Sequence, residues 1–247
     1  MKLIVALFFA VMLARVESRA DGVRLEDSEK EHRIFHFSCA FSEESANPDN
    51  LAFDLSGLSA GLGFDLVPGW LDGIQFAGIA AAAESFRGLQ TAPLMTLSET
   101  GLGLQVSIVA SWTMKRFEGI QLSGAANCAS GAGIQISCIL NETDDCFNLD
   151  DRYHNDGRKS EWTGLQLAGI CNRACFLDGV QTSLCYNYAV RCRGIQLAPW
   201  NDVDELHGLQ IGLINEARSG AGVQIGLFNF FGSGDGRLLL PLVNARF

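Results

Sequence analysis

The sequence has few of the residues that mark several common protein classes. It holds 5 Pro, 3 Tyr and 4 Trp in 247 residues, against 27 Gly. The glycines follow no Gly-X-Y period, which excludes a collagen-like chain. The 8 Cys form no Cys-x-x-Cys pair, so neither a zinc ribbon nor a thioredoxin-like motif is indicated. Abundant Gly without that period suggests many turns, or strands in which Gly occupies fixed positions.

Positive charge is also scarce. Lys and Arg total 18 against 28 Asp and Glu, so the formal net charge is −10. Residues 1–20 contribute +2, which leaves the remainder near −12. A chain this acidic repels phosphate groups, which excludes nucleic acid as a predicted partner.

The chain has no long hydrophobic run. The apolar stretch from Leu3 to Leu13 is too short for a membrane span, which needs about 20 residues. Lys2 precedes this stretch, and Ser18-Arg19-Ala20 resembles a cleavage site. This pattern predicts a secretory signal peptide at residues 1–20, cut before Asp21. Export would permit disulfide formation, and no Cys stands in the lipoprotein position.

An internal repeat dominates the rest of the sequence. The tripeptide Gly-[Ile/Leu/Val]-Gln recurs in steps of 14–16 residues, with one step of 31. It begins at Gly73, Gly88, Gly103, Gly119, Gly133, Gly164, Gly179, Gly194, Gly208 and Gly222. A looser copy starts at Gly57. The long step contains a polar, acidic stretch, which predicts an inserted loop at 141–161.

Each repeat alternates in polarity with a period of two, which is typical of a strand and not of a helix. In GVQIGLFN, Val223, Ile225 and Leu227 share one face, while Gly222, Gln224 and Gly226 share the other. We therefore expect an all-β repeat domain at 57–247 with about 12 strands. An N-terminal segment at 21–56 precedes it, with an additional strand predicted at 33–41.

Two all-β architectures fit this repeat, and an antiparallel up-and-down β-barrel in the outer membrane is the favoured expectation. Three features favour it. The chain ends in Phe247 on an alternating strand, and the repeats have one aliphatic and one small-polar face. The third is an alternation of Gly or Pro with larger residues at the sixth position of successive units: Pro93, Ile108, Gly124, Cys138, Gly169, Leu184, Pro199 and Leu213.

A β-solenoid is the alternative, because near-constant spacing suits stacked coils. The few Tyr and Trp also argue against a barrel, which normally carries aromatic girdles. Strands of eight residues are short for a bilayer, although Phe86, Phe117, Trp162 and Leu206 could extend them. The glutamines would line a barrel lumen or form a flat binding ladder on a solenoid: Gln75, Gln90, Gln105, Gln121, Gln135, Gln166, Gln181, Gln196, Gln210 and Gln224.

The phrases GLQIGLIN and GVQIGLFN at 208–229, with the closing LPLVNARF, resemble a bacterial surface-repeat family. That family carries tandem Gly-Leu-Gln-Ile-Gly-Leu-x-Asn units in exported proteins of unassigned activity. The resemblance covers about 57–247, and the Cys content and the insert depart from it. It implies a location at the surface or outer membrane, and it transfers no catalytic residue.

Few motifs in the chain could carry chemistry. Gly57-Leu58-Ser59-Ala60-Gly61 matches the nucleophile elbow GxSxG, but that motif needs a strand-to-helix turn, and no helix is predicted here. Asn141-Glu142-Thr143 is a glycosylation sequon, relevant only in a eukaryotic host. The insert carries an acidic cluster with His154, but its spacing fails the calcium-loop template. We expect no enzyme activity, no metal site and no cofactor.

The cysteines permit one structural hypothesis. In a meander, Cys146 and Cys192 fall on one rim and Cys128 and Cys175 on the other, so disulfides would pair within a rim. The sequence as a whole predicts a non-enzymatic, exported protein of the outer membrane or cell surface, with a structural or passive-pore role and the lipid bilayer as its partner. The alternative is a secreted or surface-attached β-solenoid for binding or adhesion, whose protein or glycan partner the sequence does not identify.

Overall fold

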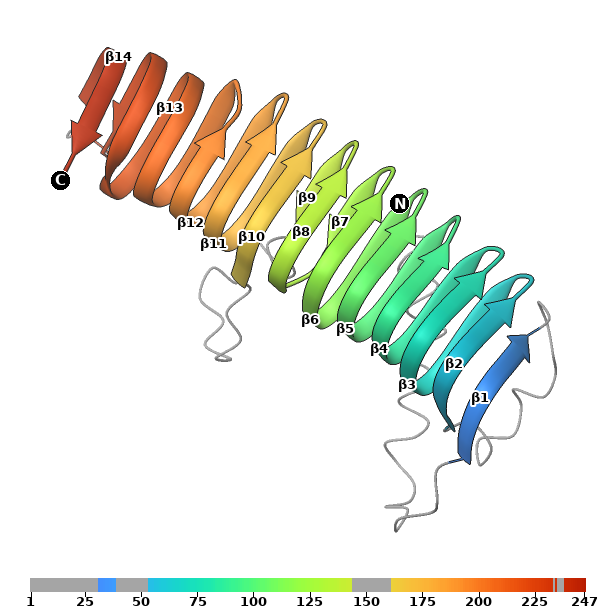
Figure 1. Cartoon of the computed structure of the whole chain (residues 1–247). Coiled ribbons are helices and arrows are strands. Elements are labelled where there is room, and N and C mark those ends of the chain that lie inside the picture. Colours follow the sequence, from blue (N-terminus) through green and yellow to red (C-terminus); the bar gives the residue numbers. More distant parts are fainter. Residues whose placement is uncertain (1–30, 39–52, 144–160, 233, 235–237) are drawn as a thin grey trace. The chain divides into compact units, whose positions relative to one another are not determined.

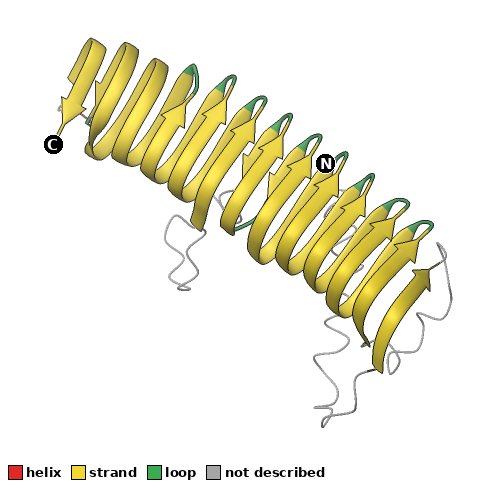
Figure 2. Ribbon diagram, viewed as in Figure 1, coloured by secondary structure: helices red, strands yellow, loops and turns green. Residues whose placement is uncertain are grey.

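The computed structural model describes residues 31–38, 53–143, 161–232, 234 and 238–247. The predicted signal peptide at 1–20 lies outside these residues. Residues His32–Phe247 belong to one compact unit. Within the described residues the secondary structure is β-strand with short connections, as Figure 2 shows.

Fourteen strands follow one another along the described part of the chain (Figure 1). They are β1 (Glu31–Ser38), β2 (Phe53–Gly61), β3 (Phe64–Ala77), β4 (Ala80–Ala92), β5 (Met95–Ser107), β6 (Ala110–Ser123), β7 (Ala126–Cys128), β8 (Gly131–Ser137), β9 (Leu140–Glu142), β10 (Glu161–Ala168), β11 (Cys171–Ser183), β12 (Tyr186–Leu197), β13 (Trp200–Phe231) and β14 (Leu238–Arg246). β1 covers much of the range 33–41 in which a strand was predicted.

Successive repeats pair in parallel and in register, so the fold is a β-solenoid. Gly73 of β3 is the partner of Gly88 in β4, and Gln75 is the partner of Gln90. The same alignment continues to β13, where Gly194 pairs with Gly208. The prediction of an antiparallel barrel was therefore wrong, because a meander requires neighbouring strands to run in opposite directions. The alternative prediction, a β-solenoid, fits the structure.

The alternation at the sixth position of the repeats is a property of the turns. Seven of the eight residues lie in the short connections between strands, drawn as loops along one edge in Figure 2, whereas Leu213 lies within β13. A Cβ on Gly124 would clash with the carbonyl oxygen of Ile108 in the preceding coil, and Gly169 stands in the same way against Cys138. Gly124 and Gly169 thus reflect close backbone contacts between neighbouring turns, and the alternation occurs here in parallel coils.

Large apolar side chains fill one part of the interior. Phe86, Phe117, Trp162 and Leu206 lie two residues before a repeat glycine and are at most 3% exposed. Their predicted role in extending strands across a bilayer was therefore wrong. Gly101 occupies the same position between two of them, where an added Cβ would clash with the rings of Phe86 and Phe117. The alternation of large and small residues lets aromatic rings fill space that belongs to the next coil.

The regular succession of repeats changes at two places, the insert and the last strand. The inserted loop was predicted from residue 141, but Asn141 and Glu142 belong to β9 and Glu161 begins β10. The coil before the insert and the coil after it stay in register, since Gly133 of β8 pairs with Gly164 of β10. At the C-terminal end, the last strand reverses direction, since β14 pairs antiparallel to β13.

Candidate binding surface

The repeat glycine allows neighbouring coils to approach closely. Gly88 has a φ of +127°, a region that L side chains rarely adopt, and a Cβ there would clash with the carbonyl oxygen of Gly73. Gly164 is placed in the same way against Gly133, across the insert. A glycine at this point in each repeat therefore holds the coils in contact and aligns the residues that follow.

The glutamine after each glycine points into the solenoid. All ten predicted glutamines are 0% exposed. Each side-chain amide from Gln90 to Gln224 donates to the Oε1 of the glutamine in the preceding coil, with Nε2–Oε1 distances of 2.7–3.0 Å. We call this row the glutamine ladder. Because the side chains are interior, they cannot form the flat external binding face predicted for a solenoid.

Several ladder glutamines also cross the interior of their own coil. The Nε2 of Gln90 donates to the carbonyl oxygen of Leu97 at 3.0 Å, and the Nε2 of Gln75 donates to that of Ala82 at 3.2 Å. In the middle coils a hydroxyl takes this place, since Gln105 donates to the Oγ of Ser98 at 3.1 Å. The ladder thus joins coil to coil and also joins the two sides of one coil.

A second ladder, which sequence reasoning missed, is made of asparagines. It comprises Asn127, Asn141, Asn172, Asn187, Asn201, Asn215 and Asn229, all 0% exposed. Each Nδ2 from Asn127 to Asn215 donates to the Oδ1 of the next asparagine at 2.8–3.1 Å. The donors of this asparagine ladder point toward the C-terminal coils, opposite to those of the glutamine ladder. The final Asn of each repeat phrase was the available signal, but it follows the glycine by eight residues in some coils and by seven in others.

The asparagine ladder also explains the sequon. Asn141 is buried, and its Nδ2 donates to the carbonyl oxygen of Leu167 at 2.7 Å and to Asn172. A glycosylating enzyme could not reach this nitrogen in the folded chain. Of the acidic cluster noted in the insert, Glu142 is buried in β9. The other members, Asp144, Asp145, Asp150, Asp151 and Asp156, and also His154, lie outside the described residues.

The Ser of the GxSxG match has a structural partner. Ser59 is 0% exposed, and its Oγ donates to the Oδ2 of Asp65 at 2.6 Å. The same Asp65 carboxylate accepts from the Nε2 of Gln75 at 3.0 Å, so it terminates the glutamine ladder. His36 lies 3.8 Å from the other oxygen of Asp65, and burial lowers the pKa of this imidazole. A serine nucleophile needs the imidazole as its base, whereas Ser59 donates to the carboxylate instead.

The aliphatic side of the repeat strands faces outward. We call this surface the aliphatic face and define it by the residues one and three positions after each repeat glycine. They are Leu58, Ala60, Ile74, Phe76, Leu89, Thr91, Leu104, Val106, Ile120, Leu122, Ile134, Ile136, Leu165, Leu167, Val180, Thr182, Ile195, Leu197, Leu209, Ile211, Val223 and Ile225. None of them is buried. Next to this face lie the exposed side chains of Ile108 and Leu184 in turns and of Leu213 and Leu227 in β13.

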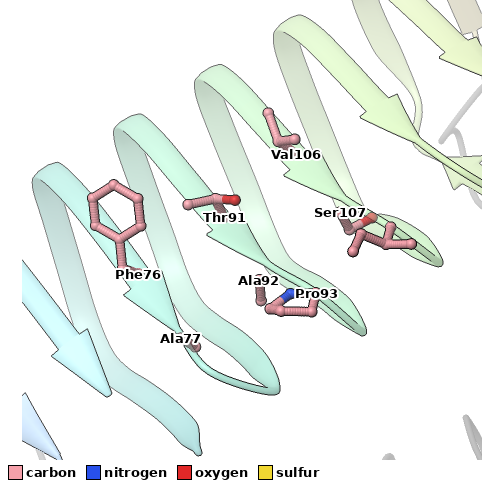
Figure 3. A pocket seen from close by; sticks show the side chains of 8 residues that line it. Phe76, Ala77, Thr91, Ala92, Pro93, Val106 and Ser107 are labelled. Carbon is pink, nitrogen blue, oxygen red and sulfur yellow. The ribbon is translucent and has the colours of Figure 1, made fainter. Parts of the chain in front are cut away.

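An open groove of about 340 Å³ marks one edge of this face. Figure 3 shows Phe76, Thr91 and Val106 on three successive coils, above a rim formed by Ala92 and Pro93 at a turn. The groove lies beside Thr91, between Phe76 and Val106 of the neighbouring coils. Its lining carries no titratable group, so it offers a shape for apolar contact and no acid or base.

Charged side chains gather elsewhere on the coils, in pairs between neighbouring repeats. Lys115 pairs with Glu99, and Arg218 pairs with Asp202 and Asp204. Burial raises the pKa of the Asp202 carboxyl, with Arg218 opposing that effect. The Lys115–Glu99 pair is typical of a solvated surface, whereas Asp202 is a buried member of the second group.

The cysteines do not follow the predicted rim pairing. Among the described residues, Cys128 and Cys192 are thiols, whereas Cys175 is disulfide-bonded. Neither Cys128–Cys175 nor Cys146–Cys192 can therefore be a disulfide, and Cys146 itself lies outside the described residues. Burial raises the pKa of Cys192 to about 12, because this side chain packs among the apolar core residues. The rim pairing assumed a meander, and it fails with that topology.

Comparison with family models, with curated proteins and with solved structures found no match for this chain. Among the described residues, no group of three or more His, Cys, Asp or Glu could hold a metal ion. In the same part of the chain, no helix is long and apolar enough to cross a membrane.

Proposed function

We propose that this chain is a non-enzymatic binding module, exported to the cell surface or beyond, whose binding surface is the aliphatic face. One observation carries the proposal: the side chains that a soluble fold would normally bury point outward here along the repeat strands. Contiguous exposed apolar patches larger than a few hundred Å² mark interaction sites on soluble proteins. The predicted signal peptide supports export, and the resemblance to a surface-repeat family supports a surface location.

The interior chemistry supports the non-enzymatic part of the proposal. Ser59 and the ladder amides are buried and engaged in structural hydrogen bonds. The groove beside Thr91 has an apolar lining without an acid, a base or a nucleophilic thiol. Each repeat therefore contributes structural hydrogen bonds to the interior and apolar side chains to the surface.

A matched pair of variants tests the binding surface. Ile136 lies on the aliphatic face and is 39% exposed, whereas Val190 lies outside it and is 37% exposed. We expect Ile136→Lys to weaken retention of the purified chain on a phenyl-substituted matrix, and Val190→Lys to leave retention unchanged. Equal retention of both variants and the parent would contradict the proposal. Protease digestion of intact expressing cells tests the location, and a chain retained in the cytoplasm would exclude export.

A further inference from the structure

The aliphatic face has a composition that restricts its partner. At the positions one to six residues after each repeat glycine from Gly57 to Gly222, no Asp, Glu, Lys, Arg or His occurs. At the outward positions of the face, Thr91 and Thr182 supply the hydroxyls, and all other side chains are hydrocarbon. We infer that this face is covered by the same face of a second copy of the chain. The inference rests on the proposed function, because it names the partner of that surface.

The size of the face matches what a stable dimer requires. The ten coils that carry a ladder glutamine span about 48 Å at the usual strand spacing, and the face is about 15 Å wide along each strand. Face-to-face contact would bury about 700 Å² on each copy, or about 1,400 Å² in total, within the range of about 1,200–2,000 Å² for stable interfaces. The neighbouring exposed side chains of Ile108, Leu184 and Leu213 would add to this area.

Its chemistry also favours a second copy. Partners of a different kind are usually recognised by Trp, Tyr and Arg at the centre of a patch, with polar groups around them. The outward positions of this face include none of these three residues. Homodimer interfaces are more apolar, and a symmetric pair meets through the same patch on both subunits. Two such faces share the same spacing of strands, so their side-chain rows can interdigitate as in a β-sandwich.

The charged groups of the chain do not oppose contact between two aliphatic faces. The chain has a net charge of −10, which would repel a second copy over most of its surface. The pairs Lys115–Glu99 and Arg218–Asp204 lie outside the aliphatic face and would stay in water in the dimer. A contact through the uncharged face keeps the acidic surfaces of both copies outward and hydrated, which lowers their mutual repulsion.

The test is the mass of the purified full chain in solution, measured by sedimentation equilibrium between about 1 and 100 µM, where a specific dimer with a dissociation constant of about 1 µM or less is mostly assembled. We expect a dimer for the parent chain and for Val190→Lys. Ile136→Lys should raise the dimer dissociation constant at least about 100-fold, because one substitution places a lysine on both apposed surfaces. Circular dichroism of all three proteins verifies that each remains folded.

The other outcomes separate this inference from the proposed function. A parent chain that stays monomeric at 100 µM overturns the inference, and so does a loss of dimer in Val190→Lys equal to that in Ile136→Lys. If the monomeric parent cosediments with phosphatidylcholine vesicles and Ile136→Lys does not, the face binds lipid: the inference fails and the proposed function stands. If dimerisation, vesicle binding and matrix retention are all the same for Ile136→Lys and Val190→Lys, both the inference and the proposed function fail.

Discussion

The glutamine ladder and the asparagine ladder solve the same problem in different parts of the coil. The glutamines run from Gln75 to Gln224, whereas the asparagines begin only at Asn127. In the earlier coils the position of the asparagine is held by smaller groups, for example Thr96, whose Oγ1 donates to the Oγ of Ser111 at 3.0 Å. The difference teaches that the glutamine recurs in every coil from β3 to β13, whereas several polar groups occupy the facing position of the asparagine.

The largest effect is expected where both ladders depend on the distance between coils. Gly164→Ala should lower the free energy of unfolding by about 4 kcal/mol, because the Cβ would clash with the Gly133 carbonyl and the backbone conformation suits glycine alone. Urea unfolding followed by circular dichroism measures it. Gly234→Ala is the control, since its added Cβ meets nothing within 4 Å. Equal losses in the two variants would show that contact between coils is not what the glycine provides.

Replacing a glutamine in the middle of the ladder should lower the free energy of unfolding more than replacing one at its end. Gln135→Leu leaves the Oε1 of Gln121 and the Nε2 of Gln166 without their ladder bonds, at a cost of about 3 kcal/mol. Gln224→Leu, at the end of the ladder, removes one ladder bond and the bond to the Phe230 carbonyl. It also removes a buried Oε1 that accepts no hydrogen bond, so it should cost less, about 2 kcal/mol. The comparison is made on midpoints and slopes of urea unfolding. A terminal variant as destabilised as the central one would mean that the ladder bonds are not the source of the loss.

Removing one asparagine should cost more than removing its counterpart in the early coils. Asn172→Ala loses the bond from Asn141 and those to Asn187 and the Thr182 carbonyl, at about 2 kcal/mol. Thr96→Ala loses the single bond to Ser111, at about 1 kcal/mol. Thermal unfolding of both variants at one pH provides the measurement. If Thr96→Ala lowers the melting temperature more than Asn172→Ala does, the asparagine ladder does not stabilise the later coils more than the hydroxyl groups stabilise the early ones.

The smallest effect is expected at the exposed charges. Hydrogen bonds from His207 and then Arg191 lower the pKa of the Glu205 carboxyl below its ordinary value of 4.5. A lowered pKa stabilises the fold above that ordinary value, and this contribution is lost as the pH falls through the folded pKa. Glu205→Gln should therefore reduce stability by less than about 0.5 kcal/mol at pH 7 and by nothing measurable at pH 3. A larger loss that persists at pH 3 would point to packing instead.

Much of the strand pattern was readable from the sequence, because alternation around Gly-x-Gln is a local property. Whether neighbouring strands pair in parallel or antiparallel was not readable from the sequence. The alternation at Gly124 and Gly169 comes from turn contacts with the preceding coil, and both a meander and a solenoid contain a turn in each repeat. The small-polar face was predicted to lie inside a barrel or outside a solenoid, and the structure places it inside a solenoid, where Gln90 reaches both Gln75 and Leu97.

The asparagine ladder escaped prediction for a related reason. Coils of 14 and 15 residues shift Asn201 by one position relative to Asn187, so a fixed-period comparison does not align them. Their pairing becomes evident only when the coils are stacked, because the extra residue is absorbed elsewhere in the coil. The disulfide hypothesis failed because rim positions were derived from the wrong topology.

The opposed directions of the two ladders have an electrical consequence. Each row of aligned amides adds up to a dipole, as the peptide units of a helix do. The glutamine row has its positive end at the N-terminal coils, where the carboxylate of Asp65 accepts from Gln75. The asparagine row has its positive end at Asn229, where Nδ2 donates to the Leu240 carbonyl in β14. From Asn127 onward the two rows largely cancel, so coils can be added to the stack without a growing field along its interior.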